Sequence, residues 1–479
     1  MSEILFLSAV SMAEKIRSRE ISSIEVVEAH LARIADLNPK LNAFVQVDVD
    51  GARQQAHLAD EALRRGSHLG PLHGVPVSIK SSIEVKGLRW EVGSKLRQGI
   101  AAAEDAALVS RLRRAGAIIL GTTNCPELLM AWETDNLLYG RTNNPCDLSR
   151  TAGGSSGGEA AAIASGCSAG GVGSDGGGSI RVPAHFCGIC GLKPTPGRIP
   201  STGHFPTSVG PFALLGVVGP MARTVADLKI LFEVIQGPDD GEPLAAPVPV
   251  RWPALQELKN LRVGYFEDDG RTPVTGETRA AVRRAAEALE RAGFDVQPFR
   301  PEGLQQAQQL WWQLFGVAGA MLLGPMLKGR EDELSPILKQ FAKRTAAENP
   351  HTAQTLLDSW ITRDVLRAQI FEQMREYPIL LCPVASIPAF GHGERSWNID
   401  GKTVQYLDAW SYCEWFNLLG MPGSAVPVGR SESGLPIGVQ IAAKPWEDEI
   451  GLSVAEILER ECGGSGSTTP SLCAELGIR

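Results

Sequence analysis

The chain has 479 residues, of which 43% are hydrophobic and 21% are charged, so it can bury a large core and is not a disordered protein. Its net charge of −8 and the lack of a long basic run argue against a nucleic-acid-binding surface. Glycine is the unusual component: it fills 52 of the 479 positions, compared with about 7% in ordinary proteins.

The N-terminal sequence and the cysteines favour a cytoplasmic protein without a membrane span. The first residues, MSEILFLSAV, lack the basic start and the long apolar stretch of a secretory signal. The longest apolar stretch, 314–327, has fourteen residues with three glycines among them, which is typical of a buried helix. Nine scattered cysteines, an odd number, indicate reduced thiols.

The first part of the chain alternates between helical and strand patterns. Ser22 and Glu25 form the S-x-x-E pattern of a capping box, and apolar residues follow at helical spacing. Helices are also predicted over 51–65 and 105–115, and strands over 74–80 and 117–120. The first of these strands delivers Lys80 at its end.

The second part of the chain continues the alternation after a proline-rich surface connection over 238–253. Strands are predicted over 261–266, 294–299, 379–383, 424–427 and 437–441, and a helix over 276–292. The segment 304–375 is mostly helical and rich in aromatic residues. Alternating helices and apolar strands predict an α/β protein whose sheet is covered on both faces.

Two glycine–serine patches stand out, GGSSGG over 153–158 and GGGSIR over 176–181. Eleven of the 26 residues from 153 to 178 are glycine, yet residues 159–164 have a helical pattern. A flexible linker has no reason to hold a helix between two glycine turns. Glycines at such turns let backbone amides approach a ligand closely, so the patches are candidates for a functional site.

Two generic motifs overlap with these patches. Residues 171–176 match GxGxxG, but no acidic residue follows at the distance that a dinucleotide fold requires, so nucleotide binding is not predicted. Residues 153–157 match GxSxG, which would make Ser155 the nucleophile of an α/β-hydrolase with His351 or His392 as its base. No sequence context singles out either histidine, and this interpretation remains an alternative.

A third interpretation combines both patches with Lys80. A serine can be activated by a neutral lysine instead of a histidine. Neutrality near pH 7 requires the lysine pKa to fall well below its usual ~10.4, which burial can achieve. A second serine between the base and the nucleophile could relay the proton, and the glycine run before Ser179 could offer amides to an oxyanion.

With Lys80, the 153–158 patch and the run 175–181, the chain resembles the amidase signature family. The spacings agree with the family pattern: 75 residues separate Lys80 from Ser155, and 24 separate Ser155 from Ser179. Further matching segments lie at 140–145, 191–198, 417–422 and 434–440. The resemblance implies an α/β amidase signature fold, in which a large mixed β-sheet is sandwiched between α-helical layers.

The resemblance also implies the roles of the site residues. Ser179 would be the acylated nucleophile, and Ser155, held by an unusual cis peptide bond, would bridge it to the general base Lys80. The backbone amides of Gly176, Gly177, Gly178 and Ser179 would form the oxyanion hole. No metal ion and no organic cofactor are expected, and no HExxH-like pairing of histidines is present.

Residues 128–133 lie where family members line the acyl pocket, which makes Leu129, Met130 and Trp132 candidate substrate-binding residues. Their apolar and aromatic character predicts an amidohydrolase for small amides with hydrophobic or aryl groups, with esters and carbamates as further candidates. The remaining alternatives are a catalytically silent binding protein and a glutamine-hydrolysing amidotransferase A-type subunit.

The resemblance further implies one amidase domain over 1–462 and a C-terminal tail over 463–479. Within the domain, the signature core would occupy about 66–240, and a variable helical region at about 300–375 would contribute to the substrate pocket. The expected partner is the small-molecule amide substrate, and a homodimer is considered.

Overall fold

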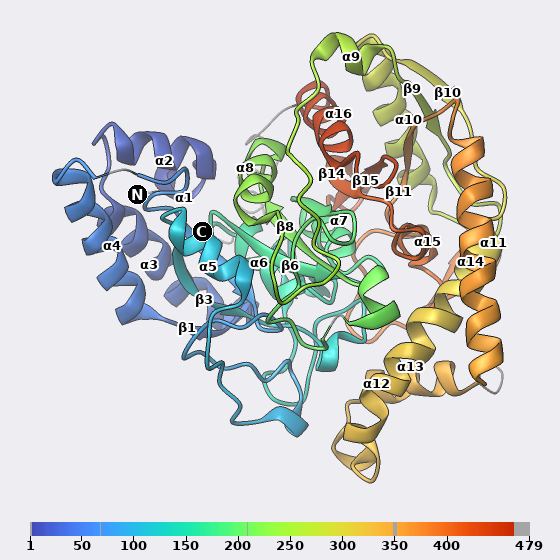
Figure 1. Cartoon of the computed structure of the whole chain (residues 1–479), viewed down its shortest axis with the longest axis horizontal. Coiled ribbons are helices and arrows are strands. Elements are labelled where there is room, and N and C mark those ends of the chain that lie inside the picture. The colour runs from blue at the N-terminus through green and yellow to red at the C-terminus, as the bar shows by residue number, and fades with distance from the viewer. Residues whose placement is uncertain (1, 68, 208, 348–351, 464–479) are drawn as a thin grey trace.

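The protein is built around one large sheet. The computed structural model describes residues 2–67, 69–207, 209–347 and 352–463 (Figure 1). Across the sheet the strands are β1 (Phe44–Val47), β3 (Ile118–Thr123), β2 (Pro76–Lys80), β6 (Gly170–Asp175), β8 (Val217–Ala222), β7 (Cys190–Lys193), β14 (Gly423–Arg430), β15 (Pro436–Ala442), β11 (Ile379–Pro383), β9 (Arg262–Tyr265) and β10 (Asp295–Pro298). Two hairpins lie outside it, β4 (Asn143–Asn144) with β5 (Asp147–Thr151), and β12 (Ser396–Ile399) with β13 (Lys402–Gln405).

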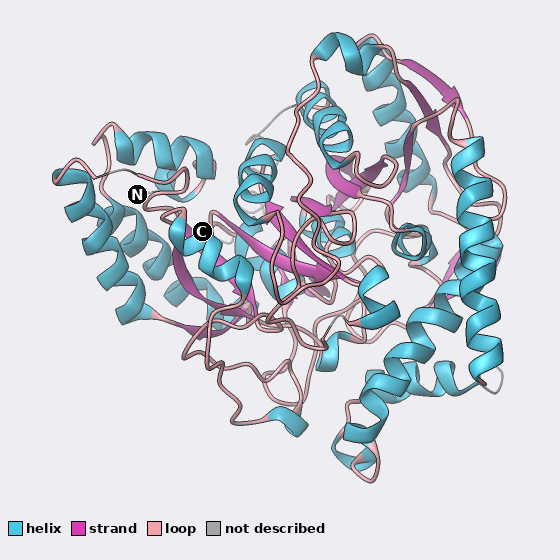
Figure 2. Cartoon of the chain, in the orientation of Figure 1, coloured by secondary structure: helices cyan, strands magenta, loops and turns pink. Residues whose placement is uncertain are grey.

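The sheet is mixed, as expected from the family resemblance. Strand β2 runs parallel to both of its neighbours, β3 and β6. Strand β9 runs parallel to β10 and β11, and the other neighbouring pairs are antiparallel. Parallel strands need coverage on both faces, and Figure 2 shows helices on both sides of the sheet.

Two hydrophobic cores lie on opposite faces, because Ile118 and Leu120 of β3 enter one core and Ile119 enters the other. One layer contains α2 (Ala9–Arg17), α5 (Ala107–Arg114), α8 (Val225–Ile235), α10 (Gly276–Arg291) and α16 (Asp448–Glu461). The other contains α3 (Ser23–Leu41), α4 (Val49–Arg64), α6 (Gly157–Ala164), α7 (Arg181–Cys187), α11 (Leu304–Trp311), α12 (Val317–Leu327), α13 (Pro336–Ala347), α14 (Ala353–Gln373) and α15 (Ser411–Leu419). Short helices complete the chain: α1 (Ser2–Leu5), α9 (Leu255–Lys259), η1 (Lys95–Arg97), η2 (Glu127–Leu129), η3 (Gly210–Leu214) and η5 (Glu331–Glu333).

Local sequence signals explain where the elements begin. Glu25 N donates a hydrogen bond to Ser22 Oγ at 3.2 Å, and Ser22 N donates to the Glu25 carboxylate at 2.8 Å, so the predicted capping box opens α3. Each helix and strand predicted from the sequence is present within a few residues of its predicted bounds. The predicted surface connection over 238–253 contains no helix or strand.

The helical segment after residue 304 is more continuous than its apolar pattern suggested. A π-helical turn, η4 (Trp312–Gly316), joins α11 to α12, so that Leu304–Leu327 forms one helix of 24 residues. By length and composition alone this helix could cross a membrane, but half of its apolar window is buried within the protein, and core helices pass the same test. Figure 1 shows α12, α13 and the start of α14 extending beyond the sheet.

Strand β6 was not predicted, because its sequence GGVGSD has no strand pattern. Its glycines are explained by helix α6, which lies directly on the strand. A Cβ atom at Gly171 would be 1.9 Å from Glu159 Oε1, and one at Gly173 would be 2.7 Å from Ser156 Oγ. The sequence is therefore selected for close approach of the serine patch to the sheet and not for strand propensity.

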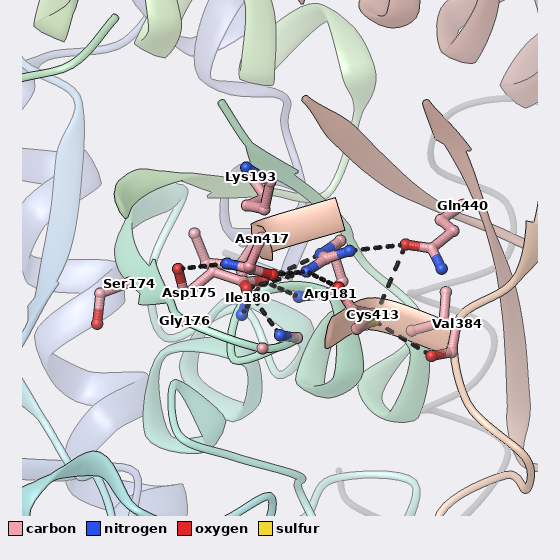
Figure 3. A network of polar contacts seen from close by, with 12 residues as sticks. Ser174, Asp175, Gly176, Ile180, Arg181, Lys193, Val384, Cys413, Asn417 and Gln440 are labelled. Atoms are coloured by element: carbon pink, nitrogen blue, oxygen red, sulfur yellow. Dashed lines mark hydrogen bonds and ion pairs between the residues drawn. The ribbon is translucent and has the colours of Figure 1, made fainter. Parts of the chain in front are cut away.

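A buried ion pair joins the central sheet to α7 and α15 (Figure 3). The Arg181 guanidinium donates to the Asp175 carboxylate at 3.0 and 3.1 Å, and both side chains are fully buried. Arg181 also donates to Gln440 Oε1 at 2.9 Å and to Asn417 Oδ1 at 2.6 Å. Burial alone would raise the pKa of Asp175, but Arg181, together with the amides of Gly178 and Ile180, outweighs burial and holds that pKa well below its usual range.

Replacing Asp175 with asparagine should destabilise the fold by about 3–5 kcal/mol, because it leaves the buried Arg181 guanidinium without its counter-ion. Urea unfolding measures this loss. As a control, Glu20→Gln removes a surface ion pair to Lys15 at 2.6 Å and should leave the unfolding midpoint unchanged. Equal midpoints for Asp175→Asn and the unmodified protein would contradict the central role of the pair.

Candidate active site

Lys80 ends strand β2 and is fully buried. Its Nζ lies 2.6 Å from Ser155 Oγ and 2.9 Å from Ser174 Oγ. Burial lowers the pKa of Lys80 to about 7, although the nearby Cys125 and acidic groups oppose this change. A substantial fraction of the amine is therefore neutral near pH 7, which is the state that can accept a proton.

The loop that carries Ser155 is held tightly against neighbouring backbone. The peptide bond between Gly154 and Ser155 is cis. A Cβ atom at Gly154 would be 2.7 Å from the backbone nitrogen and oxygen of Glu133, so only glycine fits there. Thr134 Oγ1 donates to Gly153 O at 2.8 Å and accepts from Gly157 N at 3.2 Å. These contacts fix the Ser155 hydroxyl beside Lys80.

Two further serines, which the sequence analysis did not single out, join the parts of the site. Ser156 N donates to Ser179 O at 3.1 Å, and Ser156 Oγ donates to Ser174 O at 3.2 Å. Ser174 in turn contacts Lys80 through its hydroxyl. The only sequence signal for Ser156 is its place beside Ser155, and Ser174 lies within the glycine-rich strand that had no recognisable pattern.

Ser179 is 9% exposed and lines a cavity of about 40 Å³ together with Ser155, Leu129 and Met130. No hydrogen bond joins the hydroxyls of Ser155 and Ser179 within the described part of the chain. Leu129 has a left-handed backbone with φ of 69°, a conformation that leucine rarely adopts and that is frequent at functional sites. The structure thus brings two of the three predicted catalytic residues, Ser155 and Ser179, to one small cavity, and Lys80 contacts the first of them.

The glycine loop before Ser179 is oriented by two tryptophans. Trp311 Nε1 donates to Gly176 O, and Trp132 Nε1 donates to Gly177 O, each at 2.8 Å. Both indoles are almost fully buried. Because the C=O and N–H of one trans peptide point in opposite directions, the bond to Gly176 O fixes the direction of the Gly177 amide, and the bond to Gly177 O fixes that of the Gly178 amide.

The loop differs from the sequence-based expectation at two residues. Gly178 N donates to the Asp175 carboxylate at 2.7 Å, so this amide is engaged and is not available to an oxyanion. The amides of Gly176, Gly177 and Ser179 have no hydrogen-bond partner among the described residues. Trp132 does not line the cavity with Leu129 and Met130 but packs behind the loop, stacked on Trp410 at 5.9 Å.

A buried carboxyl group lies near Lys80 and interacts with its amine electrostatically. Glu159 of α6 accepts hydrogen bonds from Ser78 Oγ at 2.5 Å and from Thr123 Oγ1 at 2.7 Å. Burial raises the pKa of Glu159 to about 7, against the effect of these two hydroxyls and of Lys80. The contacts tie α6 to β2 and β3, the strands that position Lys80.

The α/β-hydrolase alternative finds no support in this geometry, because Ser155 contacts a lysine and not a histidine. His392 N donates to Ser149 O at 3.3 Å, and His392 does not line the cavity with Ser155. His351 lies outside the described residues. In the described part of the chain, no three histidine, cysteine, aspartate or glutamate side chains form a group that could hold a metal ion.

Comparisons with known proteins identify relatives along almost the whole chain. The Amidase family model matches residues 25–452. The indoleacetamide hydrolase of Bradyrhizobium diazoefficiens is 35% identical to this chain, and the match covers 95% of this chain and 86% of the hydrolase. The A-type subunit of the glutamyl-tRNA(Gln) amidotransferase of Roseiflexus castenholzii is 34% identical over 95% of this chain and 96% of its own. A solved bacterial aryl acylamidase of the amidase signature family has a TM-score of 0.87 at 26% identity, over 99% of both chains.

These matches confirm the family resemblance and the fold that it implies. They span the sheet from β1 to β15 as well as both helical layers. The enzymes so matched act on carbon–nitrogen bonds. The chain therefore belongs to the amidase family of amidase signature enzymes and is a hydrolase of carbon–nitrogen bonds other than peptide bonds.

Proposed function

We propose that this enzyme hydrolyses small amides with hydrophobic acyl or aryl groups through an acyl-enzyme on Ser179. The observation that carries the proposal is the buried Lys80 amine, 2.6 Å from Ser155 Oγ and beside the cavity that Ser179 lines. Lys80 is the general base, Ser155 is the proton relay, and Ser179 is the nucleophile. Names of relatives, an indoleacetamide hydrolase and an aryl acylamidase, fit this substrate class.

In the acylation step, neutral Lys80 takes the Ser155 proton while Ser155 takes the Ser179 proton. Ser179 Oγ turns toward Ser155 and attacks the amide carbon. The negative oxygen of the tetrahedral intermediate is stabilised by the free amides of Gly176, Gly177 and Ser179, and such donors typically contribute about 2.7–4 kcal/mol each. When the C–N bond breaks, the proton returns through Ser155 to the leaving nitrogen.

In the deacylation step, water replaces the amine. The same relay removes a proton from the water, whose oxygen attacks the ester carbon of the acyl-enzyme. Breaking the bond to Ser179 Oγ releases the carboxylic acid and returns the proton to that oxygen. Each cycle thus consumes one amide and one water and regenerates the hydroxyl of Ser179 and the neutral amine of Lys80.

Apolar cavity walls support hydrophobic substrates. The cavity beside Ser179 is also lined by Phe212 and Phe315, whose rings are stacked at 4.9 Å. A second, mainly apolar cavity of about 350 Å³ lies between α12 and α13, and Met130 lines both cavities. Methionine side chains are flexible. Rotation of Met130 would join the two spaces and give an apolar group room to extend from Ser179.

The same walls argue against glutamine, the substrate of the amidotransferase alternative. Free glutamine carries an ammonium and a carboxylate, which both need charged or polar partners when buried. The charged residue at the cavity is Asp175, and its carboxylate is already engaged by Arg181 and by backbone amides. A binding protein without activity would have no use for a base with a lowered pKa beside two serines.

The experiment that tests the proposal compares kcat/KM for anilides, fatty amides, esters, carbamates and glutamine with the purified chain. An anilide of a hydrophobic acid should exceed glutamine by at least about 100-fold, because a site built for apolar groups leaves buried charges unpaired. Efficient hydrolysis of glutamine and none of the anilide would identify the amidotransferase activity. Turnover of no amide would overturn the proposal.

Ser179→Ala should lower kcat by about a millionfold and abolish labelling by a fluorophosphonate probe, because it removes the atom that is acylated. Ser155→Ala should retain a small residual activity, because the nucleophile and the oxyanion donors remain. Intact labelling of Ser179→Ala, together with loss of labelling in Ser155→Ala, would instead favour the hydrolase in which Ser155 is the nucleophile.

Activity should rise with pH through the pKa of Lys80, which burial lowers to about 7. Below this pH the amine holds its proton and cannot accept another, so kcat/KM should fall about tenfold for each pH unit. Above it the profile should level off. The control is Lys80→Met, which should lose about 100- to 10,000-fold in activity and show no such rise. A flat profile of the unmodified enzyme from pH 5 to 9 contradicts a lysine base.

Trp132→Phe should lower kcat about tenfold with little change in KM, because it removes the indole N–H that holds the Gly177 carbonyl and so loosens the loop that carries the Gly177 and Ser179 amides, but leaves the cavity wall in place. The control is Trp397→Phe, at a partly exposed indole that hydrogen-bonds Glu394 at 2.8 Å. A changed KM with unchanged kcat would show that Trp132 binds substrate directly.

A further inference from the structure

The active-site cavity contains one more polar side chain that the proposed mechanism does not use. His204 lines the same cavity as Ser155 and Ser179. Its Nδ1 lies 2.9 Å from Pro206 O, and because a carbonyl oxygen only accepts hydrogen bonds, Nδ1 must carry the ring proton. Its Nε2 is buried and has no hydrogen-bond partner among the described residues. Nε2 therefore presents an unused lone pair.

The charge state of His204 follows from its surroundings. Burial lowers the pKa of His204 to about 4, the bond to Pro206 opposes this shift, and a charge on Lys80 would lower the pKa further. The imidazole is neutral at every pH at which Lys80 is also neutral. A neutral ring with its proton on Nδ1 can only accept at Nε2, so it cannot stabilise an oxyanion.

The backbone around His204 is hydrogen-bonded to the segment that follows Lys80. Phe205 N donates to Ser82 O at 2.8 Å, and Glu84 N donates to Gly203 O at 2.9 Å. An isolated antiparallel bridge pairs His204 itself with Ile83. The imidazole is therefore held against the segment that directly follows Lys80, and not by the glycine loop that would hold the oxyanion. In the proposed mechanism the proton of Lys80 reaches the leaving nitrogen through Ser155.

A trans amide has its N–H directed away from its C=O. If the glycine-loop amides hold the carbonyl oxygen, the N–H of the same bond points to another part of the cavity and needs an acceptor there. If the substrate N–H found no acceptor in this water-excluding cavity, binding would be less favourable, and the same holds if His204 Nε2 found no donor. An ester oxygen at this position would place its own lone pairs against Nε2.

We infer that His204 Nε2 accepts the N–H of the scissile amide and so selects amides that carry a hydrogen on the leaving nitrogen over esters and N,N-disubstituted amides. This specificity role rests on the proposed function, because it requires an amide carbonyl at Ser179. His204 takes no proton in the reaction; it contacts the substrate and orients the nitrogen toward the Ser155 hydroxyl.

The test uses three substrates with one hydrophobic acyl group: an anilide, the matching N-methylanilide and the phenyl ester. His204→Phe keeps a ring but removes the acceptor, and His204→Gln restores an acceptor in the side-chain oxygen. For the anilide, His204→Phe should lower kcat/KM by about 10- to 100-fold. For the other two substrates, which have no N–H, the change should stay within about threefold. His204→Gln should regain most of the anilide activity.

Each outcome separates the two proposals. Equal losses of His204→Phe on all three substrates, or no loss on the anilide, overturn the specificity role while the enzyme remains an amidase. Turnover of none of the three by the unmodified enzyme removes the proposed function and this inference with it. Fluorophosphonate labelling and the thermal midpoint report whether each variant is folded, and His204→Leu, a smaller replacement without an acceptor, gives the same comparison if His204→Phe does not fold.

Discussion

The site depends on removing the amine of Lys80 from water. Burial makes the charged form costly, and because no carboxylate of the described residues pairs with the amine directly, the group responds by losing its proton more readily. Burial is not sufficient by itself. The Lys193 amine is also fully buried with its pKa lowered to about 7, but it donates to Pro194 O at 2.9 Å, and a carbonyl has no proton to give. Lys80 instead has the Ser155 hydroxyl 2.6 Å away, and this contact is what would let it act as the base of the proposed mechanism.

The Asp175–Arg181 pair shows the opposite response to burial. Here two opposite charges meet with several hydrogen bonds, and both groups remain charged. The pair lies between the sheet and the loop of Ser179, and it engages the Gly178 amide. A fixed carboxylate thus shapes the loop without taking part in proton transfer. The same protein interior supports a neutral base and a permanent ion pair because their immediate partners differ.

Much of this arrangement could be predicted from the sequence where the signal is local. Apolar patterns located several helices and seven of the eleven strands of the main sheet, and a capping box marked the start of α3. The spacing of Lys80, Ser155 and Ser179 allowed the family resemblance to be recognised. Strand β6 could not be predicted from its sequence, because its glycines make room for the close packing of Glu159 and have no strand pattern. The residue pattern of one segment does not reveal which other segment will pack against it in the fold.

The contacts that hold the glycine loop and Asp175 could not be predicted for a related reason: they join segments that are far apart in the sequence. Trp311 donates a hydrogen bond to the carbonyl of Gly176, which is 135 residues away in the sequence, and Asn417 donates one to the carbonyl of Asp175, which is 242 residues away. The sequence also placed Trp132 in the substrate wall, whereas it holds the glycine loop from behind. Even the Gly178 amide, three residues from Asp175, could not be assigned without knowing that the carboxylate turns back onto the loop.

The wall of the cavity is mostly apolar, with hydrogen-bond donors on one side and an acceptor at another place. Free amide donors lie in the glycine loop, an unused acceptor lies at His204, and the side chains of Leu129, Met130 and Phe315 supply apolar wall. A secondary amide is a group with an acceptor at one end and a donor at the other, so it matches both polar walls at once. An ester matches only the first. The specificity of the site would then follow from the balance of donors and acceptors as much as from its shape, because in a water-excluding cavity each unmatched group is costly.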